Sequence, residues 1–309
     1  MMRTGFLFAG QGAQSIGMAR DLYEAYPLVK EIYDTASDVL GYDLREVIDT
    51  DEAKLQQTRY TQPAILTTSF AIYRLLEVVG ITPDMVAGLS LGEYTALVAA
   101  GSLSFEEAVA LVAKRGSFME EAAPAGSGKM VAILNTDAAL IEAVCQEASC
   151  LGVVAPANYN TPQQIVIGGT GEAVDKAVAL LSEKGVTRMI PLNVSGPFHT
   201  ALLRPASEKL RRVLETIDFQ PPRVPVIGNT LAAIMSETDM PDLLSRQVME
   251  PVRFYESIDR MTASGVTRFI EIGPGKVLTG FMKRIAKGAD LYQVDTLESL
   301  HKLEASYGH

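Results

Sequence analysis

The sequence feature that most constrains the fold is a serine between two glycines, in Gly88-Leu89-Ser90-Leu91-Gly92. This pattern, G-x-S-x-G, follows a predicted buried strand at Met85–Leu89 and precedes a predicted helix at Leu91–Ala100. Small neighbours are needed at a sharp strand-to-helix turn, because the backbone is crowded there. The helix also directs its free N–H groups towards the serine. The motif predicts a nucleophilic Ser90; the alternative is a tight turn that happens to contain serine.

Strands and helices alternate along both ends of the chain. The predicted strands there are Thr4–Ala9, Met85–Leu89, Val224–Gly228 and Thr267–Ile272. The predicted helices include Ile16–Tyr26, Val29–Leu40, Phe105–Ala122, Ala201–Ile217 and an apolar helix opened by Gln62-Pro63 and running to about Val79. Such alternation predicts an α/β fold whose mainly parallel sheet is covered on both faces.

The middle of the chain has a different order of elements. From Lys129 to Leu192 the pattern indicates strand, helix, two strands, helix and strand, in the segments Met130–Leu134, Ala138–Ala148, Val153–Ala157, Gln164–Ile167, Gly171–Lys184 and Arg188–Pro191. This βαββαβ order is typical of the ferredoxin-like arrangement. We therefore expect residues 127–193 to form a subdomain inserted into a core made of residues 1–126 and 194–309.

A nucleophilic serine needs a base, and the chain offers few. Its histidines are His199, His301 and His309, of which the last two lie in a polar C-terminal tail. His199 lies in a loop containing Gly196 and Pro197, and a neutral imidazole can take a serine proton at neutral pH. We predict that His199 is the base, although a lone loop histidine is more often a surface residue.

No acidic residue stands out as the third member of a triad. Asp218, Asp242 and Glu271 are candidates by position alone, and each is expected to face solvent. An amide or a backbone carbonyl that orients the imidazole is equally compatible with the sequence.

Two further features are candidates for binding the substrate or the transition state. Gly10-Gln11-Gly12 ends the first strand, and the backbone N–H there could pair with that of Leu91 to form an oxyanion hole. The alternatives are a phosphate loop or a plain turn. Arg115 and Met119 lie on one face of a predicted helix, where the ordinary expectation for an arginine is solvation.

Composition excludes several classes of protein. The formal net charge of −10 argues against binding nucleic acid, whose phosphates require a basic face. The N-terminus does not resemble a signal peptide and the apolar stretches are too short to span a bilayer, so we expect no membrane partner and a cytoplasmic location. Cys145 and Cys150 are expected to be reduced, and two thiols with three histidines do not suggest a metal site.

Several motifs together resemble the malonyl-CoA:acyl carrier protein transacylase family and the related acyltransferase domains of polyketide and animal fatty acid synthases. They occur in family order and span nearly the whole chain. They are Phe8-Ala9-Gly10-Gln11-Gly12-Ala13-Gln14, Gln62-Pro63-Ala64, Gly88-Leu89-Ser90-Leu91-Gly92-Glu93-Tyr94, Arg115-Gly116, Gly196-Pro197-Phe198-His199 and Glu271-Ile272-Gly273-Pro274-Gly275. The family commonly has Ser where Ala13 stands.

The resemblance implies a hydrolase-like α/β core with a ferredoxin-like insertion. It also implies roles for individual residues: Ser90 as nucleophile, His199 as base, Gln11 and Leu91 as oxyanion donors, Arg115 as the ligand of the malonyl carboxylate, Gln247 as the residue whose backbone carbonyl orients the histidine, and Met119 and Asn160 as pocket residues. The implied substrate is malonyl-CoA and the implied partner is acyl carrier protein, which brings its own phosphopantetheine. We expect no metal or redox cofactor.

The sequence is also compatible with two other functions. A serine hydrolase, such as a thioesterase or lipase, uses the same serine turn, although Arg115 and the missing acid argue against it. A non-catalytic relative within a polyketide assembly is the second alternative, against which the pair Ser90 and His199 argues. Basic residues in Arg268–Lys287 and Arg204–Arg212 are either docking patches for an acidic carrier protein or ordinary solvated helix faces.

Overall fold

The computed structural model describes residues 2–308, and within them the strands form two sheets. The larger sheet is parallel, in the order β7-β2-β1-β8-β9. Its strands are β1 (Arg3–Phe8), β2 (Met85–Gly88), β7 (Val226–Ile227), β8 (Val266–Ile272) and β9 (Asp290–Val294). The α/β core with a mainly parallel sheet is therefore confirmed.

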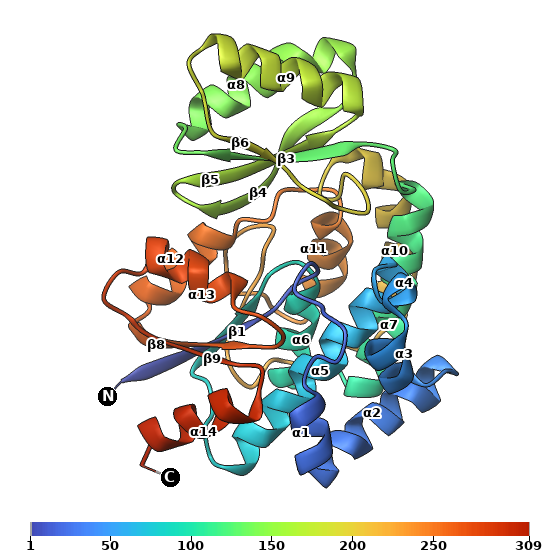
Figure 1. Cartoon of the computed structure of the whole chain (residues 1–309), viewed down its shortest axis with the longest axis vertical. Helices are drawn as coiled ribbons and strands as arrows, with labels where there is room; N and C mark the ends of the chain where they lie inside the picture. Colours follow the sequence, from blue (N-terminus) through green and yellow to red (C-terminus); the bar gives the residue numbers. More distant parts are fainter. Residues whose placement is uncertain (1, 309) are drawn as a thin grey trace.

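Helices cover both faces of this sheet (Figure 1). Successive residues of β1 point to opposite faces of the sheet. Phe6 and Phe8 therefore pack into one apolar cluster, and Leu7 packs into another. The first cluster involves α1 (Arg20–Ala25), α2 (Pro27–Leu40), α3 (Leu44–Thr50), α4 (Glu52–Leu55), α5 (Thr58–Val78), α6 (Leu91–Ala99), α7 (Phe105–Ala122), α10 (Arg204–Leu214), α11 (Met240–Gln247) and α14 (Leu297–Ser306). The second involves α12 (Phe254–Ala263) and α13 (Val277–Ile285).

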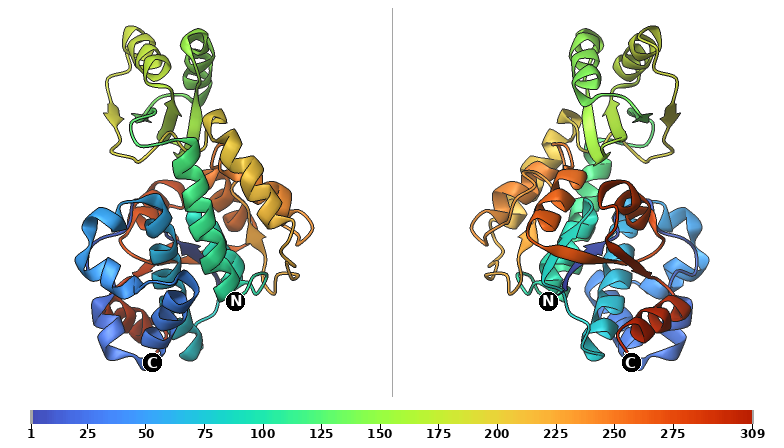
Figure 2. Two further views of the ribbon diagram at one scale, coloured as in Figure 1. Left: turned by 90° about the vertical axis from the view of Figure 1, so that its right-hand side faces the viewer. Right: turned by 90° about the vertical axis from the view of Figure 1, so that its left-hand side faces the viewer.

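The smaller sheet is antiparallel, in the order β4-β5-β3-β6. It comprises β3 (Lys129–Leu134), β4 (Val154–Thr161), β5 (Gln164–Gly169) and β6 (Met189–Pro191), with α8 (Ala138–Ala148) and α9 (Gly171–Glu183) packed on one face. This is the predicted ferredoxin-like arrangement, and its strands and helices all fall within residues 127–193. Figures 1 and 2 show it at one end of the molecule, with its sheet facing the core and its helices facing away.

Two helices near the N-terminus begin elsewhere than predicted. The expected helix from Ile16 is shortened to α1, because Gly17 and Ala19 have left-handed backbone angles, with φ of 73° and 55°. Conversely, α5 begins at Thr58, so Pro63 lies inside the helix and does not open it. The helix tolerates this proline in its second turn, because the missing N–H leaves only the carbonyl of the exposed Arg59 without its usual partner.

The C-terminal region is more ordered than the sequence suggested. Strand β9 and helix α14 occupy the segment that was expected to be a polar tail. Thr296 caps α14, which buries Leu300 and Leu303 and carries the exposed His301. His309 lies outside the described residues. Smaller differences are that β7 is shorter than Val224–Gly228 and that a 3₁₀ turn at Ala201–Leu203 precedes α10.

The glycines of the serine motif are required by close packing of the backbone. A Cβ atom on Gly88 would lie 2.0 Å from the carbonyl carbon of Gly92, and one on Gly92 would lie 2.1 Å from the carbonyl oxygen of Phe8 in β1. Helix α6 therefore starts directly against the end of β1, and only residues without side chains fit at these two positions. No helix formed by residues 2–308 combines the length and hydrophobicity needed to cross a membrane.

We predict that Gly92→Ala lowers the free energy of unfolding by about 3 kcal/mol, because the new methyl group meets a backbone oxygen that cannot move freely. Gly280 is a matched control, since it is also helical and a Cβ there meets nothing within 4 Å. Gly280→Ala should stabilise the protein by about 0.5–1 kcal/mol. Urea unfolding of the two variants measures the difference, and equal effects would contradict this packing.

Candidate active site

A cavity of about 920 Å³ lies between the core and the antiparallel sheet. One side consists of the loop after β1, the serine turn and α13, which contribute Gly10–Gln14, Ser90 and Phe281. The other side consists of residues on the face of the smaller sheet, including Met130, Asn160 and Val166. In Figure 1 the smaller sheet lies above the core, and α12 and α13 lie between it and the parallel sheet. The site therefore needs both parts of the chain.

Ser90 and His199 meet in this cavity although they are 109 residues apart. The Ser90 Oγ lies 2.9 Å from His199 Nε2. Both residues have left-handed backbone angles, with φ of 53° at Ser90 and 60° at His199, conformations that are unusual for residues with side chains. The structure thus brings together the predicted nucleophile and base on two strained turns.

The tautomer of His199 follows from its second hydrogen bond. Its Nδ1 lies 2.6 Å from the backbone carbonyl oxygen of Gln247, which can only accept, so Nδ1 carries the proton and donates it. The Nε2 atom is then unprotonated and can accept from the Ser90 hydroxyl. The backbone carbonyl of Gln247 thus orients the imidazole, which is the role of the acidic residue in a Ser-His-Asp triad.

The acidic candidates take no part in this arrangement. Asp218 and Asp242 are exposed to solvent as expected. The expectation was wrong for Glu271, which is 2% exposed. Its carboxylate accepts hydrogen bonds from the backbone N–H groups of Leu278 and Thr279, so it caps the start of α13, an interaction favoured by the helix dipole.

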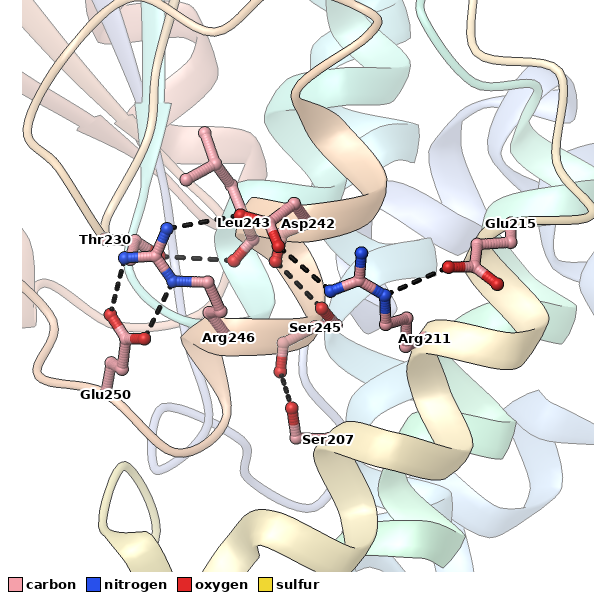
Figure 3. A network of polar contacts seen from close by, with 9 residues as sticks. All are labelled: Ser207, Arg211, Glu215, Thr230, Asp242, Leu243, Ser245, Arg246 and Glu250. Carbon is pink, nitrogen blue, oxygen red and sulfur yellow. Dashed lines mark hydrogen bonds and ion pairs between the residues drawn. The ribbon is translucent and has the colours of Figure 1, made fainter.

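Helix α11 ends at Gln247, and a polar network on its outer side fixes it against α10 (Figure 3). Asp242 pairs with Arg211 of α10 and with Arg246, which also pairs with Glu250. Beneath these exposed pairs, the buried Ser207 hydroxyl donates to the carbonyl of Ser245 over 2.6 Å. Exposed ion pairs contribute little each, so the buried bond and apolar packing hold the helix end more firmly.

Burial controls the protonation of the base. The pKa of His199 is lowered to about 4, mainly by burial and also by the nearby Arg115 cation, while the hydrogen bond to Gln247 opposes the change. The imidazole is therefore neutral at pH 7, as a general base must be.

Arg115 is inside the site and not in solvent. The residue is 1% exposed, and its Nη2 donates to the Ser90 Oγ over 3.1 Å and to the Gln247 Oε1 over 2.8 Å. Its Nη1 donates to the Gln62 Oε1, also over 2.8 Å. Burial lowers the pKa of Arg115, but a guanidinium stays charged at neutral pH. The arrangement can bind a carboxylate next to the serine hydroxyl.

The remaining predicted residues lie around this centre. Gln11 lines the cavity, and Leu91 is the first residue of α6. Neither backbone N–H donates a hydrogen bond to any atom of residues 2–308, so both are free to bind an oxyanion. Met119 lies one turn after Arg115 and lines the cavity, as does Asn160, whose Nδ2 donates to Gln164 over 2.9 Å.

Two residues that hold the serine turn were not predicted from the sequence. The Oδ1 of Asn229 accepts from the backbone N–H of Ser90 over 2.7 Å, and its Nδ2 donates to the carbonyl of Gly88 over 2.7 Å. Glu93, 1% exposed, accepts from the backbone N–H of Asn229 and from the Gln247 Nε2. Burial raises the pKa of Glu93 to about 7. For Asn229 the available signal was a polar residue after a predicted strand, in Gly228-Asn229. Glu93 was noted only as part of the serine motif, with no role assigned to it.

Residues 2–308 contain no cluster of three or more His, Cys, Asp or Glu side chains arranged for a metal ion. Both cysteines are free: Cys145 is buried and Cys150 is exposed.

The chain matches the acyl transferase domain family over residues 5–303. The malonyl CoA-acyl carrier protein transacylase of Bacillus subtilis (strain 168) is 48% identical over 303 residues, which cover 97% of this chain and 96% of that relative. The crystal structure of MCAT from Streptococcus pneumoniae has a TM-score of 0.97 and 64% identity, covering 98% of this chain and 100% of that one. A complex of PlMCAT with the type II PKS acyl-carrier protein AntF has a TM-score of 0.95 and 41% identity, covering 98% and 99% of the two chains.

We predict that a fluorophosphonate probe labels Ser90 at nearly the same rate at pH 5.5 and pH 7.5. With its pKa lowered to about 4, the His199 imidazole stays neutral over this range. A histidine of ordinary pKa would be only about one-tenth neutral at pH 5.5, and the labelling rate would fall in proportion to this neutral fraction. Rates measured by intact-mass spectrometry test this, with circular dichroism at each pH as the control for folding. A tenfold loss at pH 5.5 would contradict it.

Proposed function

The chain belongs to the malonyl CoA-acyl carrier protein transacylase family, and on this basis we propose that it transfers a malonyl group from malonyl-CoA to the phosphopantetheine thiol of acyl carrier protein. The acyl group is carried between the two thiols as an ester on Ser90. The enzyme is thus an acyl-carrier-protein S-malonyltransferase, with the two substrates reacting in turn. Carrier proteins of fatty acid synthesis and of polyketide synthesis both carry a phosphopantetheine thiol, so either could be the acceptor.

One observation supports malonyl over other acyl groups. The buried guanidinium of Arg115 lies 3.1 Å from the Ser90 Oγ, where the far end of a short acyl chain on Ser90 would lie within its reach. A malonyl group brings a free carboxylate, which a guanidinium can bind through two parallel hydrogen bonds. An acetyl group leaves the buried cation without a partner, so it is rejected strongly.

The first half-reaction forms the acyl-enzyme. His199 Nε2 takes the proton of the Ser90 hydroxyl as Oγ attacks the thioester carbon of malonyl-CoA. The backbone N–H groups of Gln11 and Leu91 donate to the oxyanion, each contributing about 2.7–4 kcal/mol in such sites. When the C–S bond breaks, the CoA sulfur leaves with the proton from His199.

The second half-reaction reverses these roles. The phosphopantetheine thiol gives its proton to His199 as its sulfur attacks the malonyl ester carbon. The C–O bond to Ser90 then breaks, and the proton returns from His199 to Oγ. Every proton moves between the acyl donor, the acceptor and one imidazole, so the scheme includes no metal or redox cofactor.

Docking of the acidic carrier protein requires a basic surface on an acidic enzyme. Of the two basic segments, the one at α10 is partly neutralised, because Lys209 pairs with Glu121 and Arg211 with Glu215. At α13, Lys276, Lys283, Arg284 and Lys287 are exposed, and no ion pair involving them occurs among the described residues. Val277, Leu278 and Phe281 of this helix line the cavity, so we favour α13 as the docking surface. The cytoplasmic location stays a prediction.

We predict that incubation with malonyl-CoA adds the mass of one malonyl group to the protein, and that subsequent carrier protein removes it. Ser90→Ala should capture none, because the hydroxyl that forms the ester is absent. Intact-mass spectrometry follows both steps on one sample. Labelling that persists in Ser90→Ala would identify another nucleophile, and a malonyl group lost to water as fast as to carrier protein would make the chain a hydrolase.

A further inference from the structure

Arg115 is held by side chains that do not neutralise it. Among the described residues it forms no ion pair, and its side-chain hydrogen bonds go to Gln62, Gln247 and Ser90. Burial raises the pKa of Glu93, and the Arg115 charge is near enough to oppose this rise. The side-chain amide of Gln247 lies between the two residues and is hydrogen-bonded to both. The hydrogen-bond acceptors that surround the guanidinium are therefore neutral. The carboxylate of Glu93 does not contact it directly, because Gln247 lies between them.

Gln62 and Gln247 bind different terminal nitrogens of this cation, Nη1 and Nη2 respectively. Gln62 lies in α5 and is fully buried, at 0% exposure. Its Oε1 accepts from Arg115 Nη1, and its Nε2 contacts the Gln11 Oε1 and the Met119 Sδ, both at 3.4 Å. The single amide thus connects the arginine with the loop that carries a proposed oxyanion donor.

We propose that Gln62 is a specificity-determining residue, because its side chain binds Arg115 through a neutral oxygen and so leaves the charge of the guanidinium for the acyl group to neutralise. This inference rests on the proposed function, in which Arg115 binds the malonyl carboxylate. Buried in a site of low dielectric, an unneutralised cation gains most from a substrate that brings a negative charge. The charge at position 62 therefore sets how strongly malonyl is preferred to acetyl.

A carboxylate at this position would weaken that preference for a simple reason. Held at the 2.8 Å contact that Gln62 now makes, it would form a direct ion pair with Arg115. A malonyl carboxylate would then have to displace it or share the cation with it, whereas acetyl would no longer leave the cation unpaired. The change acts on the ratio of the two donors and not on the reaction of Ser90.

The hydrogen-bond network around Gln62 can accommodate the exchange of its Nε2 for an oxygen. The Gln11 Oε1 then needs to turn away, and the Gln11 Nε2 to take its place. The present partners of that Nε2 are the hydroxyls of Thr58, at 3.1 Å, and Ser195, at 3.3 Å. The two hydroxyls are 3.1 Å apart and share one hydrogen bond. Since each can donate as well as accept, the other proton is available to the Gln11 oxygen after the amide turns.

The test compares Gln62→Glu with Gln62→Met, which has similar length and no charge, and with Arg115→Ala. Single-turnover acylation of Ser90 is measured by quenched intact-mass spectrometry with malonyl-CoA and with acetyl-CoA. We expect the malonyl-to-acetyl rate ratio to fall at least about tenfold in Gln62→Glu. In Gln62→Met it should stay within about threefold of the wild-type ratio, since the cation remains unneutralised. Fluorophosphonate labelling of Ser90 checks that each variant is folded.

The outcomes separate this inference from the proposed function. An unchanged ratio in Gln62→Glu, beside a lowered ratio in Arg115→Ala, overturns the role of Gln62 alone. An unchanged ratio in Arg115→Ala overturns the carboxylate site and this inference with it. An equal fall in Gln62→Met and Gln62→Glu also overturns the inference, because loss of the bond and not the added charge is then responsible. If Gln62→Glu does not fold, retention of the ratio in Gln62→Met supports the inference and its loss overturns it.

Discussion

A buried positive charge next to the Ser90 hydroxyl is the feature on which the rest of the site depends. Burying an unpaired charge is costly, so the guanidinium of Arg115 must be well hydrogen-bonded to stay there. Gln62 and Gln247 provide that support without neutralising it. The same charge and the same burial lower the pKa of His199 and keep the imidazole neutral. One environment thus prepares both the recognition of a carboxylate and the removal of the serine proton.

Gln247 connects these two functions through different atoms of one residue. Its backbone carbonyl fixes the His199 tautomer, while its side-chain amide contacts Arg115 and donates to the Ser90 carbonyl over 2.9 Å. It stands at the end of α11, which the contacts drawn in Figure 3 fix to α10. The position of the base, of the cation and of the serine turn therefore depends on how one helix end packs, which explains why no acidic residue is needed beside the histidine.

The sequence predicted the parts of this site that local patterns determine. The Gly88–Gly92 turn depends on adjacent residues, and the insertion on a run of short elements, so both were found. Gln62 was noted only within a resembling motif, and Asn229 was not singled out, because their roles arise from contacts between residues 53 and 139 positions apart. The assignment of Glu271 to solvent was wrong since its burial depends on α13, and β9 and α14 were missed because each buries few side chains.

The most direct test of the account is a crystal structure of the enzyme after reaction with malonyl-CoA in the absence of carrier protein. We expect a malonyl ester on the Ser90 Oγ, with its free carboxylate bound by the Arg115 guanidinium through two hydrogen bonds and its carbonyl oxygen facing the N–H groups of Gln11 and Leu91. An ester whose carboxylate points towards the cavity mouth, away from Arg115, would contradict the central claim.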